Sequence, residues 1–146
     1  FKPIEGGYRF ERSLLKATEI DLADCPDLGP ILFTLGCFCN GSTVIHNAGR
    51  LRLKESDRIT AMQEELKKLG ARIEVDGDTV TITGVALHAP AEPLYGHNDH
   101  RIVMALAVAV YAAGLPALLR GAEAVNKSWP AFWDTLRGLG AKIETE

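Results

Sequence analysis

The chain has 146 residues, the size of one ordinary domain. Hydrophobic residues make up 47% of it and charged residues 24%, so a packed core is available and a disordered chain is not expected. With 16 basic and 19 acidic residues, the formal charge is -3, which argues against general nucleic-acid binding because that function needs a basic face.

The sequence also argues against a membrane protein, a secreted protein and a metalloprotein. It has no run of about 18 apolar residues free of polar breaks, and its first ten residues lack the basic and apolar regions of a signal peptide. The cysteines Cys25, Cys37 and Cys39 are odd in number and two lie in an apolar run, which predicts reduced, buried thiols in a cytosolic protein. The four histidines are scattered, so no metal site is predicted.

The first third of the chain predicts strands on either side of a buried helix. Residues 8–12 and 18–22 alternate in the manner of short strands. An apolar run then lies between Asp27, a favoured helix N-cap, and a helix-ending Asn-Gly pair at 40–41. Because the run is apolar nearly all round, its helix should be buried on most sides. Residues 42–46 alternate as the next strand.

Residues 54–69 predict a helix with one apolar face. The stripe recurs at steps of three or four residues and consists of Ile59, Met62, Leu66 and Leu69. Four charged residues lie off the stripe and are expected to be solvated: Glu64, Glu65, Lys67 and Lys68. A hairpin follows, with strands at 72–75 and 79–82 around an Asp-Gly-Asp turn.

The second half predicts a similar series of elements. Asp99 precedes residues 100–113, another helix that is apolar nearly all round. A strand over 116–120, a helix over 130–139 and a final strand over 141–144 follow.

Four landmarks recur at a nearly constant offset. The first series is Asp27, Gly41, Lys54 and residues 69–74, and the second is Asp99, Gly114, Lys127 and residues 139–144. The offsets are 72, 73, 73 and 70 residues, which is hard to obtain by chance. The pattern predicts a duplicated α/β unit, with approximate bounds of 18–83 and 86–146, whose second copy lacks its last hairpin strand.

Polar residues gather at the predicted helix N-termini of both units. They are Asp27, Lys54, Glu55, Arg58, Asp99, Arg101, Lys127 and Ser128. Helix N-termini offer free N–H groups and a positive dipole end, so the added cations predict a pocket for phosphate or carboxylate ligands. Asp27 and Glu55 are the acid and base candidates beside it.

Each of these residues also has a simpler interpretation. For Asp27 and Asp99, helix physics alone favours a role as N-caps. Arg58 can pair with Glu55 or Glu65 on a solvated helix face. His100 can be a structural hydrogen-bonding residue, and Lys127 an ordinary loop lysine.

Four segments resemble the EPSP synthase (3-phosphoshikimate 1-carboxyvinyltransferase) family. They are residues 25–27, 51–59, 98–105 and 126–130, followed by Phe132. The resemblance covers the chain in order from about Ile20 onward, and its most specific parts are residues 54–58 and 98–101. It implies an α/β fold of repeated βαβαββ units with buried helices ringed by sheets. It also implies that residues 1–146 are a C-terminal fragment of one domain, with the N-terminal domain absent.

The resemblance further implies a carboxyvinyltransferase of the shikimate pathway, which leads to chorismate and the aromatic amino acids. Enolpyruvyl passes from phosphoenolpyruvate to the 5-hydroxyl of shikimate 3-phosphate through a tetrahedral intermediate, and phosphate is released. No metal or organic cofactor is implied. The partners would be these two anionic small molecules, without nucleic acid or membrane, in a monomeric cytoplasmic enzyme.

The resemblance assigns roles residue by residue. Asp27 corresponds to the carboxylate that contacts the shikimate hydroxyls and accepts a proton, and Lys54 to a ligand of shikimate 3-phosphate. Glu55 corresponds to the proton shuttle at the phosphoenolpyruvate methylene. Arg58, Arg101 and Lys127 correspond to the cations that bind phosphoenolpyruvate. Lys127 also corresponds to a proton-transfer candidate. Arg50 departs from the family pattern, in which Asn or His can occupy that position.

Two alternatives stay open. One is the sister enzyme that transfers enolpyruvyl to a UDP-sugar, which shares the fold. The other is a folded, non-catalytic module with weak anion binding. The family's other domain supplies a Lys-Ser pair, a glycine loop, an arginine and a Ser-x-Gln segment that cannot be matched here, so the isolated chain is expected to be inactive.

Overall fold

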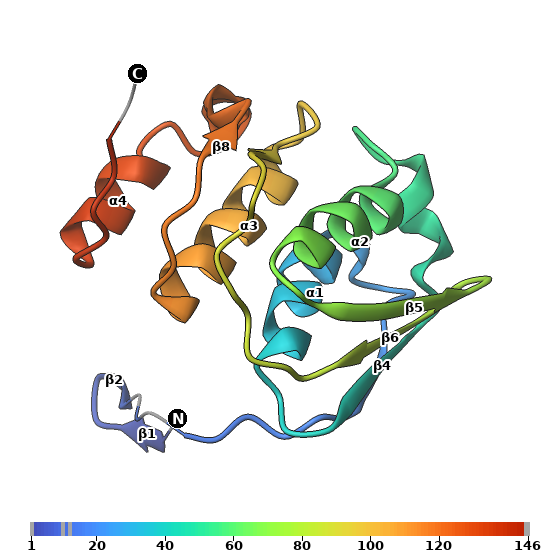
Figure 1. Cartoon of the computed structure of the whole chain (residues 1–146). Helices are drawn as coiled ribbons and strands as arrows, with labels where there is room; N and C mark the ends of the chain where they lie inside the picture. Colours follow the sequence, from blue (N-terminus) through green and yellow to red (C-terminus); the bar gives the residue numbers. More distant parts are fainter. Residues whose placement is uncertain (1, 10, 12, 145–146) are drawn as a thin grey trace.

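Strands and helices alternate along most of the chain in this computed structural model, which describes residues 2–9, 11 and 13–144 (Figure 1). The first unit contains, in order, β3 (Glu19–Asp21), α1 (Gly29–Cys37), β4 (Ser42–His46), α2 (Arg58–Lys68), β5 (Arg72–Asp76) and β6 (Thr79–Thr83). The second contains β7 (Leu94–Tyr95), α3 (His100–Ala113), β8 (Leu119–Arg120) and α4 (Phe132–Gly138). The predicted α/β fold is confirmed, whereas the bounds 18–83 and 86–146 stay a prediction.

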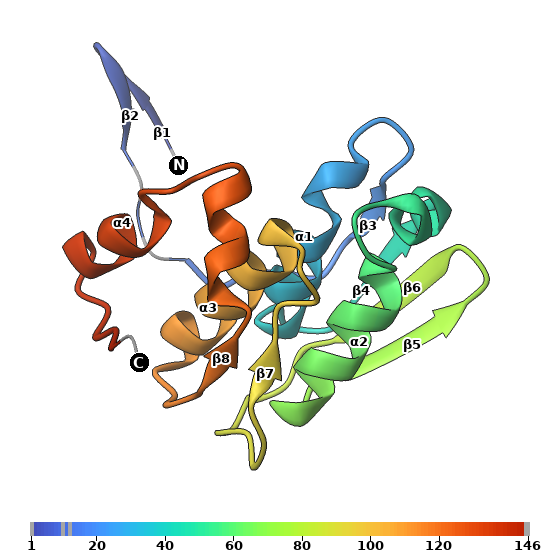
Figure 2. The same ribbon diagram turned by 90° about the horizontal axis from the view of Figure 1, so that it is seen from above.

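Short 3-10 helices connect several of these elements. They are η1 (Pro26–Leu28), η2 (Ala48–Leu53) and η3 (Ala122–Lys127). A hairpin of β1 (Lys2–Ile4) and β2 (Gly7–Arg9) stands apart from the body of the molecule in both views (Figures 1 and 2).

The main sheet has four strands in the order β3-β4-β6-β5. β3 and β4 are parallel, with Ile20 opposite Ile45, and β6 runs antiparallel to both β4 and β5. β7 and β8 form a separate parallel pair, in which Leu94 lies opposite Leu119. Each unit therefore starts with two parallel strands joined through a helix.

The core lies between the four-stranded sheet and the helices α1, α2 and α3 (Figure 1). Its fully buried side chains include Phe33, Ile45, Met62, Ile82 and Leu106. Burial of each such side chain contributes about 1.5–3 kcal/mol. A smaller cluster joins α3 to α4 through Val103, Val125, Phe132 and Leu136.

The start of α1 differs from the prediction. Cys25 and Leu28 occupy the N-cap positions of η1 and α1, so the interpretation of Asp27 as an N-cap is wrong. A Cβ on Gly29 would lie 2.6 Å from Leu51 Cδ1, so the small residue lets α1 approach η2 closely. Asp27 lies within the short 3-10 helix η1, with its carboxylate available to other partners.

The start of α2 also differs from the prediction. Asp57 caps the helix by accepting from the backbone N–H groups of Ile59 and Thr60, both at 3.1 Å. Lys54 has an extended backbone after η2, so Lys54 and Glu55 lie in the loop before the helix. The predicted stripe is confirmed, because its four members are buried.

The prediction that Glu65 is solvated is wrong, because Glu65 is only 2% exposed. A stripe pattern identifies the apolar face of a helix, but α2 packs on its other side against the polar segment around Tyr95 and His97. The carboxylate is buried there among hydrogen-bond donors.

The predicted bounds of α3 are confirmed. Asp99 caps the helix by accepting from the Arg101 N–H at 2.9 Å, and Gly114 ends it with a φ of 66°. Residues 100–110 are buried or partly buried, but Tyr111 in the last turn is exposed, so burial on most sides holds for part of the helix only. The buried Thr34 hydroxyl donates to the Ala105 carbonyl at 3.0 Å and links α1 to α3.

Some predicted strands are shorter or missing. Residues 141–144 form no strand within the described part of the chain, because a strand needs a paired neighbour and they lack one there. Within the strand predicted over 8–12, β2 ends at Arg9, and Phe10 and Arg12 lie outside the described residues. The strand predicted over 116–120 is reduced to β8.

Two further predictions concern the thiols and the membrane. All three cysteines are free, and Cys37 is buried while the other two are partly exposed. Burial raises the pKa of the Cys37 thiol to about 11. Across residues 2–9, 11 and 13–144, no helix combines the length and apolar character needed to cross a bilayer.

Candidate functional site

The candidate site lies beyond the carboxyl ends of both parallel strand pairs. β3 leads to Asp27, and β4 leads through η2 to residues 54–58. In the second unit, β7 leads to residues 98–101, and β8 leads through η3 to Lys127. Loops and helix N-termini at such ends commonly bind anionic ligands in α/β folds.

Asp27 is the point at which the predicted cations converge. Its Oδ1 lies 3.2 Å from Lys54 Nζ and 3.1 Å from Arg58 Nη1. Arg101 reaches Oδ2 through Nη2 at 3.3 Å and the Asp27 carbonyl through Nη1 at 3.1 Å. Because the Asp27 side chain is 52% exposed, this cluster faces solvent.

Behind Asp27, Arg58 and Asp99 form a buried fork. Arg58 Nε lies 2.8 Å from Asp99 Oδ2, and Nη2 lies 3.2 Å from Oδ1. Arg58 is 3% exposed and Asp99 0%, so this bidentate pair is removed from water. Ser56 also donates to Oδ2, at 3.1 Å. The predicted pairing of Arg58 with Glu55 or Glu65 on a solvated face is therefore wrong.

The carboxylates of Asp27 and Asp99 are both held in the ionised form. Burial works to raise the pKa of Asp27, but the hydrogen bond from Lys54 and the charge of Arg101 outweigh it and lower the pKa below its ordinary value. Burial works more strongly on Asp99, and there the hydrogen bond from Arg58 and the Arg101 N–H lower the pKa overall.

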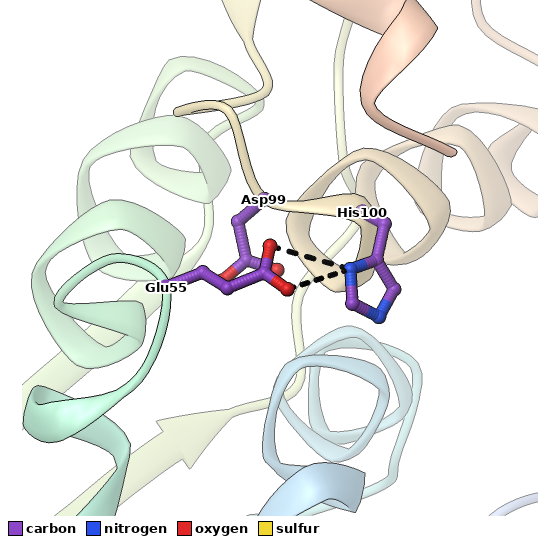
Figure 3. A group of neighbouring side chains, drawn as sticks. All are labelled: Glu55, Asp99 and His100. Carbon is purple, nitrogen blue, oxygen red and sulfur yellow. Dashed lines mark hydrogen bonds and ion pairs between the residues drawn. The ribbon is translucent and has the colours of Figure 1, made fainter. Parts of the chain in front are cut away.

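Glu55 forms a second group beside this fork (Figure 3). His100 Nδ1 lies 3.2 Å from Glu55 Oε1, and Lys127 Nζ lies 3.6 Å from Oε2. Lys127 also donates to the Asn98 carbonyl. The loop before α2, the start of α3 and the end of η3 thus meet at one carboxylate.

Glu55, Asp99 and His100 bring three potential metal ligands within 4.8 Å of one another. Both Asp99 oxygens, however, already accept hydrogen bonds from Arg58, Ser56 or the Arg101 N–H. A guanidinium bound to a ligand oxygen would repel a cation placed there. The donor set therefore suits internal charge pairing better than a metal ion.

The structure brings together all six residues that the sequence analysis singled out as site residues: Asp27, Lys54, Glu55, Arg58, Arg101 and Lys127. Their individual roles stay predictions. Arg50 lies outside this group and donates to the Ala23 carbonyl at 3.2 Å.

Sequence reasoning missed three contributions to the site. Ser56 lies in the family-like segment 54–58 but was given no role. Asp99 was named among the pocket residues without a partner, and His100 was interpreted as a structural residue. Asp99 is indeed an N-cap, but the same carboxylate also binds Arg58, 41 residues earlier in the chain. No spacing rule in a single sequence reports such a long-range pair.

Comparisons with known proteins agree on one family. The family model described as EPSP synthase (3-phosphoshikimate 1-carboxyvinyltransferase) matches residues 5–136. The 3-phosphoshikimate 1-carboxyvinyltransferase of Halorubrum lacusprofundi is 43% identical over 92% of this chain and 30% of its own length. That of Methanocaldococcus jannaschii is 43% identical over 98% of this chain and 32% of its own length. The chain thus spans less than a third of these curated relatives.

Solved structures agree with the sequence matches. An EPSP synthase structure from Acinetobacter baumannii has a TM-score of 0.76 and 28% identity, covering 86% of this chain and 30% of that one. The enolpyruvyl transferase NikO from Streptomyces tendae has a TM-score of 0.71 and 26% identity, covering 90% of this chain and 29% of that one.

Proposed function

Because this chain belongs to the EPSP synthase family, we propose that it supplies one wall of the active site in a longer protein that makes EPSP. That protein transfers the enolpyruvyl group of phosphoenolpyruvate to the 5-hydroxyl of shikimate 3-phosphate. The hydroxyl oxygen adds to C2 of phosphoenolpyruvate while C3 gains a proton, giving a tetrahedral intermediate. Loss of a C3 proton then expels inorganic phosphate and restores the double bond.

One observation carries the proposal: Lys54, Arg58 and Arg101 converge on a single half-exposed carboxylate, Asp27. A cluster of cations at the carboxyl ends of strands suits two anionic substrates. Arg101 has the more open guanidinium of the two arginines, at 34% exposure against 3%. We therefore assign the main phosphoenolpyruvate contact to Arg101, with Lys127 beside it and Arg58 contributing through Nη1.

Asp27 is assigned the contact with the shikimate hydroxyls and the role of proton acceptor. While three cations surround it, its lowered pKa makes it a weak base. Anionic substrates would compete for Lys54 and Arg101, and this would weaken their hold on Asp27. The carboxylate would then gain basicity when the acceptor hydroxyl is bound.

Lys54 is assigned to shikimate 3-phosphate, and Glu55 to proton transfer at the phosphoenolpyruvate methylene. Glu55 lies 3.6 Å from Lys127 Nζ and 3.2 Å from His100 Nδ1, so an ammonium group and an imidazole stand on two sides of it. Lys127 is the further proton-transfer candidate. Transfer in both steps requires such a group to give and then take a proton at the same carbon.

The names of the curated relatives support shikimate 3-phosphate as the acceptor rather than a UDP-sugar. We propose that the longer protein acts in the cytoplasm as a monomer. The isolated chain is proposed to be inactive, because catalysis needs groups from both walls within reach of one transition state.

A phosphate-release assay tests these proposals. A protein of the relatives' length that contains this chain is mixed with phosphoenolpyruvate and either shikimate 3-phosphate or a UDP-sugar. We expect phosphate release with shikimate 3-phosphate alone. Release with the UDP-sugar instead would assign the sister reaction, and turnover by the isolated chain at the rate of an ordinary enzyme would refute the two-wall argument.

A further inference from the structure

Glu65 is a buried carboxylate that the proposed chemistry does not use. Its Oε2 accepts from the Tyr95 N–H at 2.9 Å, and its Oε1 lies 3.1 Å from His97 Nε2. Lys68 Nζ bridges both oxygens at 2.8 and 2.9 Å and donates to the Pro93 carbonyl at 3.2 Å. One carboxylate, with its lysine, thus holds the segment 93–97 at three points.

The held segment has a backbone that needs support. His97 and Asn98 have φ values of 49° and 53°, in the left-handed region that residues other than glycine seldom adopt. A Cβ on Gly96 would lie 2.4 Å from Val103 Cγ2, so the segment also passes very close to α3. Such conformations persist only where the surroundings fix them, and the Glu65 carboxylate contacts the segment on the His97 side, while Lys127 binds the Asn98 carbonyl.

Glu65 and Arg58 act from the same side of α2. They are seven residues apart, which is two helical turns or about 10 Å along the axis. Arg58 binds Asp99, and Glu65 binds Tyr95 and His97. Since α2 carries both residues, one helix of the first unit holds both ends of the segment 95–99 of the second unit.

The candidate site begins where this segment ends. The Asn98 carbonyl accepts from Lys127, His100 contacts Glu55, and Arg101 contacts Asp27. We propose that Glu65 is a positioning residue: through the segment 93–98 it fixes His100, Arg101 and the Asn98 carbonyl where the anionic substrate and Lys127 need them. The kinetic part of this inference rests on the proposed function.

The test uses Glu65→Gln in the longer protein. Glutamine has nearly the same size, but it loses the charge, and its single oxygen can replace only one of the two carboxylate oxygens that meet Tyr95, His97 and Lys68. We expect the KM for phosphoenolpyruvate to rise about tenfold, the scale of one lost charge-assisted hydrogen bond, with a smaller change in kcat. Amide hydrogen exchange should become faster at Tyr95 and also at Arg101.

Two further variants make the result decisive. Glu64→Gln, at an exposed position of the same helix, is the matched control and should change neither quantity. If Glu65→Gln does not fold, His97→Asn removes one contact, keeps a residue that tolerates the left-handed region, and should raise the KM about threefold.

A lower melting temperature with unchanged KM and unchanged exchange at Arg101 would make Glu65 merely structural and overturn the proposal. If the wild-type protein releases no phosphate, the proposed function fails. The exchange rate at Arg101 then decides alone, with acceleration in Glu65→Gln supporting the positioning role and equal rates overturning it.

Discussion

Asp27 and Asp99 occupy corresponding places in the two sequence series, yet they have different environments. Asp27 lies in the 3-10 helix η1, its side chain is 52% exposed, and it contacts three cations from two parts of the chain. Asp99 is fully buried, caps α3, and binds one arginine in a fork. Arg58 touches both carboxylates, so the two residues form the outer and inner ends of one charge network.

The difference teaches which carboxylate supports the fold and which is free for chemistry. A buried ion pair is costly to break, because removal of one partner leaves the other charge without solvent or counterion. An exposed carboxylate exchanges partners with water and solutes at small cost. Asp99 therefore has the features of a structural anchor, and Asp27 those of a group that can meet a substrate.

The largest expected effect is on stability. Asp99→Ala removes the buried fork of Arg58 and leaves the guanidinium only its Nη1 contact to Asp27, so we expect it to lower the free energy of unfolding by about 3–5 kcal/mol. Asp27→Ala should cost less than about 1 kcal/mol, because the Asp27 side chain is half exposed and Arg58 keeps its buried fork on Asp99. Urea denaturation of both variants measures the difference. Equal losses would mean that burial does not separate the two carboxylates.

A second comparison concerns turnover in the longer protein. Asp27→Asn keeps the size of the side chain but removes the proton acceptor, so kcat should fall about 10²–10⁴-fold while the melting temperature stays near that of the wild type. Glu55→Gln should behave similarly if it shuttles a proton. Steady-state kinetics beside thermal unfolding provides the test, and near-normal kcat for Asp27→Asn would exclude it as a base.

The two arginines should respond differently to replacement by lysine. Arg58→Lys loses the fork on Asp99, and we expect about 1.5–3 kcal/mol of lost stability. Arg101→Lys should leave stability nearly unchanged but raise the KM for phosphoenolpyruvate, because two nitrogen contacts become one. The assignment of Arg101 is wrong if its lysine variant binds phosphoenolpyruvate as well as the wild type does.

The smallest expected effect is a pH dependence. The pKa of Asp99 is lowered in the folded protein, so its ionised form contributes stability above the unfolded value of about 3.9. That contribution is lost as pH falls through the lower folded value. Asp99→Asn should therefore flatten the loss of stability below about pH 4. Asp27→Asn should do so less, because the Asp27 carboxylate is half exposed and solvent screens its charge interactions. Denaturation midpoints measured between pH 5 and pH 2 test this.

Sequence patterns predicted helix caps, helix ends and apolar faces well, because residues close together in the sequence determine these features. The cap at Asp99, the end of α3 at Gly114 and the stripe of α2 are set by neighbours within a few residues, and the structure has all of them. The strand over 141–144 was wrong because a strand depends on a partner that alternation does not report.

The contacts that make the site join residues far apart in the sequence, so local patterns do not report them. The pairing of Arg58 with Asp99 spans 41 residues and depends on how α2 packs against the second unit. The same packing buries Glu65, which the pattern of α2 placed on its solvated side. The pattern of helix N-termini grouped Asp27 with Lys54, Arg58 and Arg101 in one anion pocket, and the resemblance to the EPSP synthase family added the role expected of each residue.

The close matching of opposite charges in the site has a consequence for its response to salt. Lys54, Arg58, Arg101 and Lys127 face the carboxylates Asp27, Glu55 and Asp99, so four positive charges are opposed by three negative ones. The net charge of the group is therefore small, and we expect long-range attraction to contribute little to the proposed binding of an anion. Such binding should depend on shape and hydrogen-bond direction and change little with salt concentration.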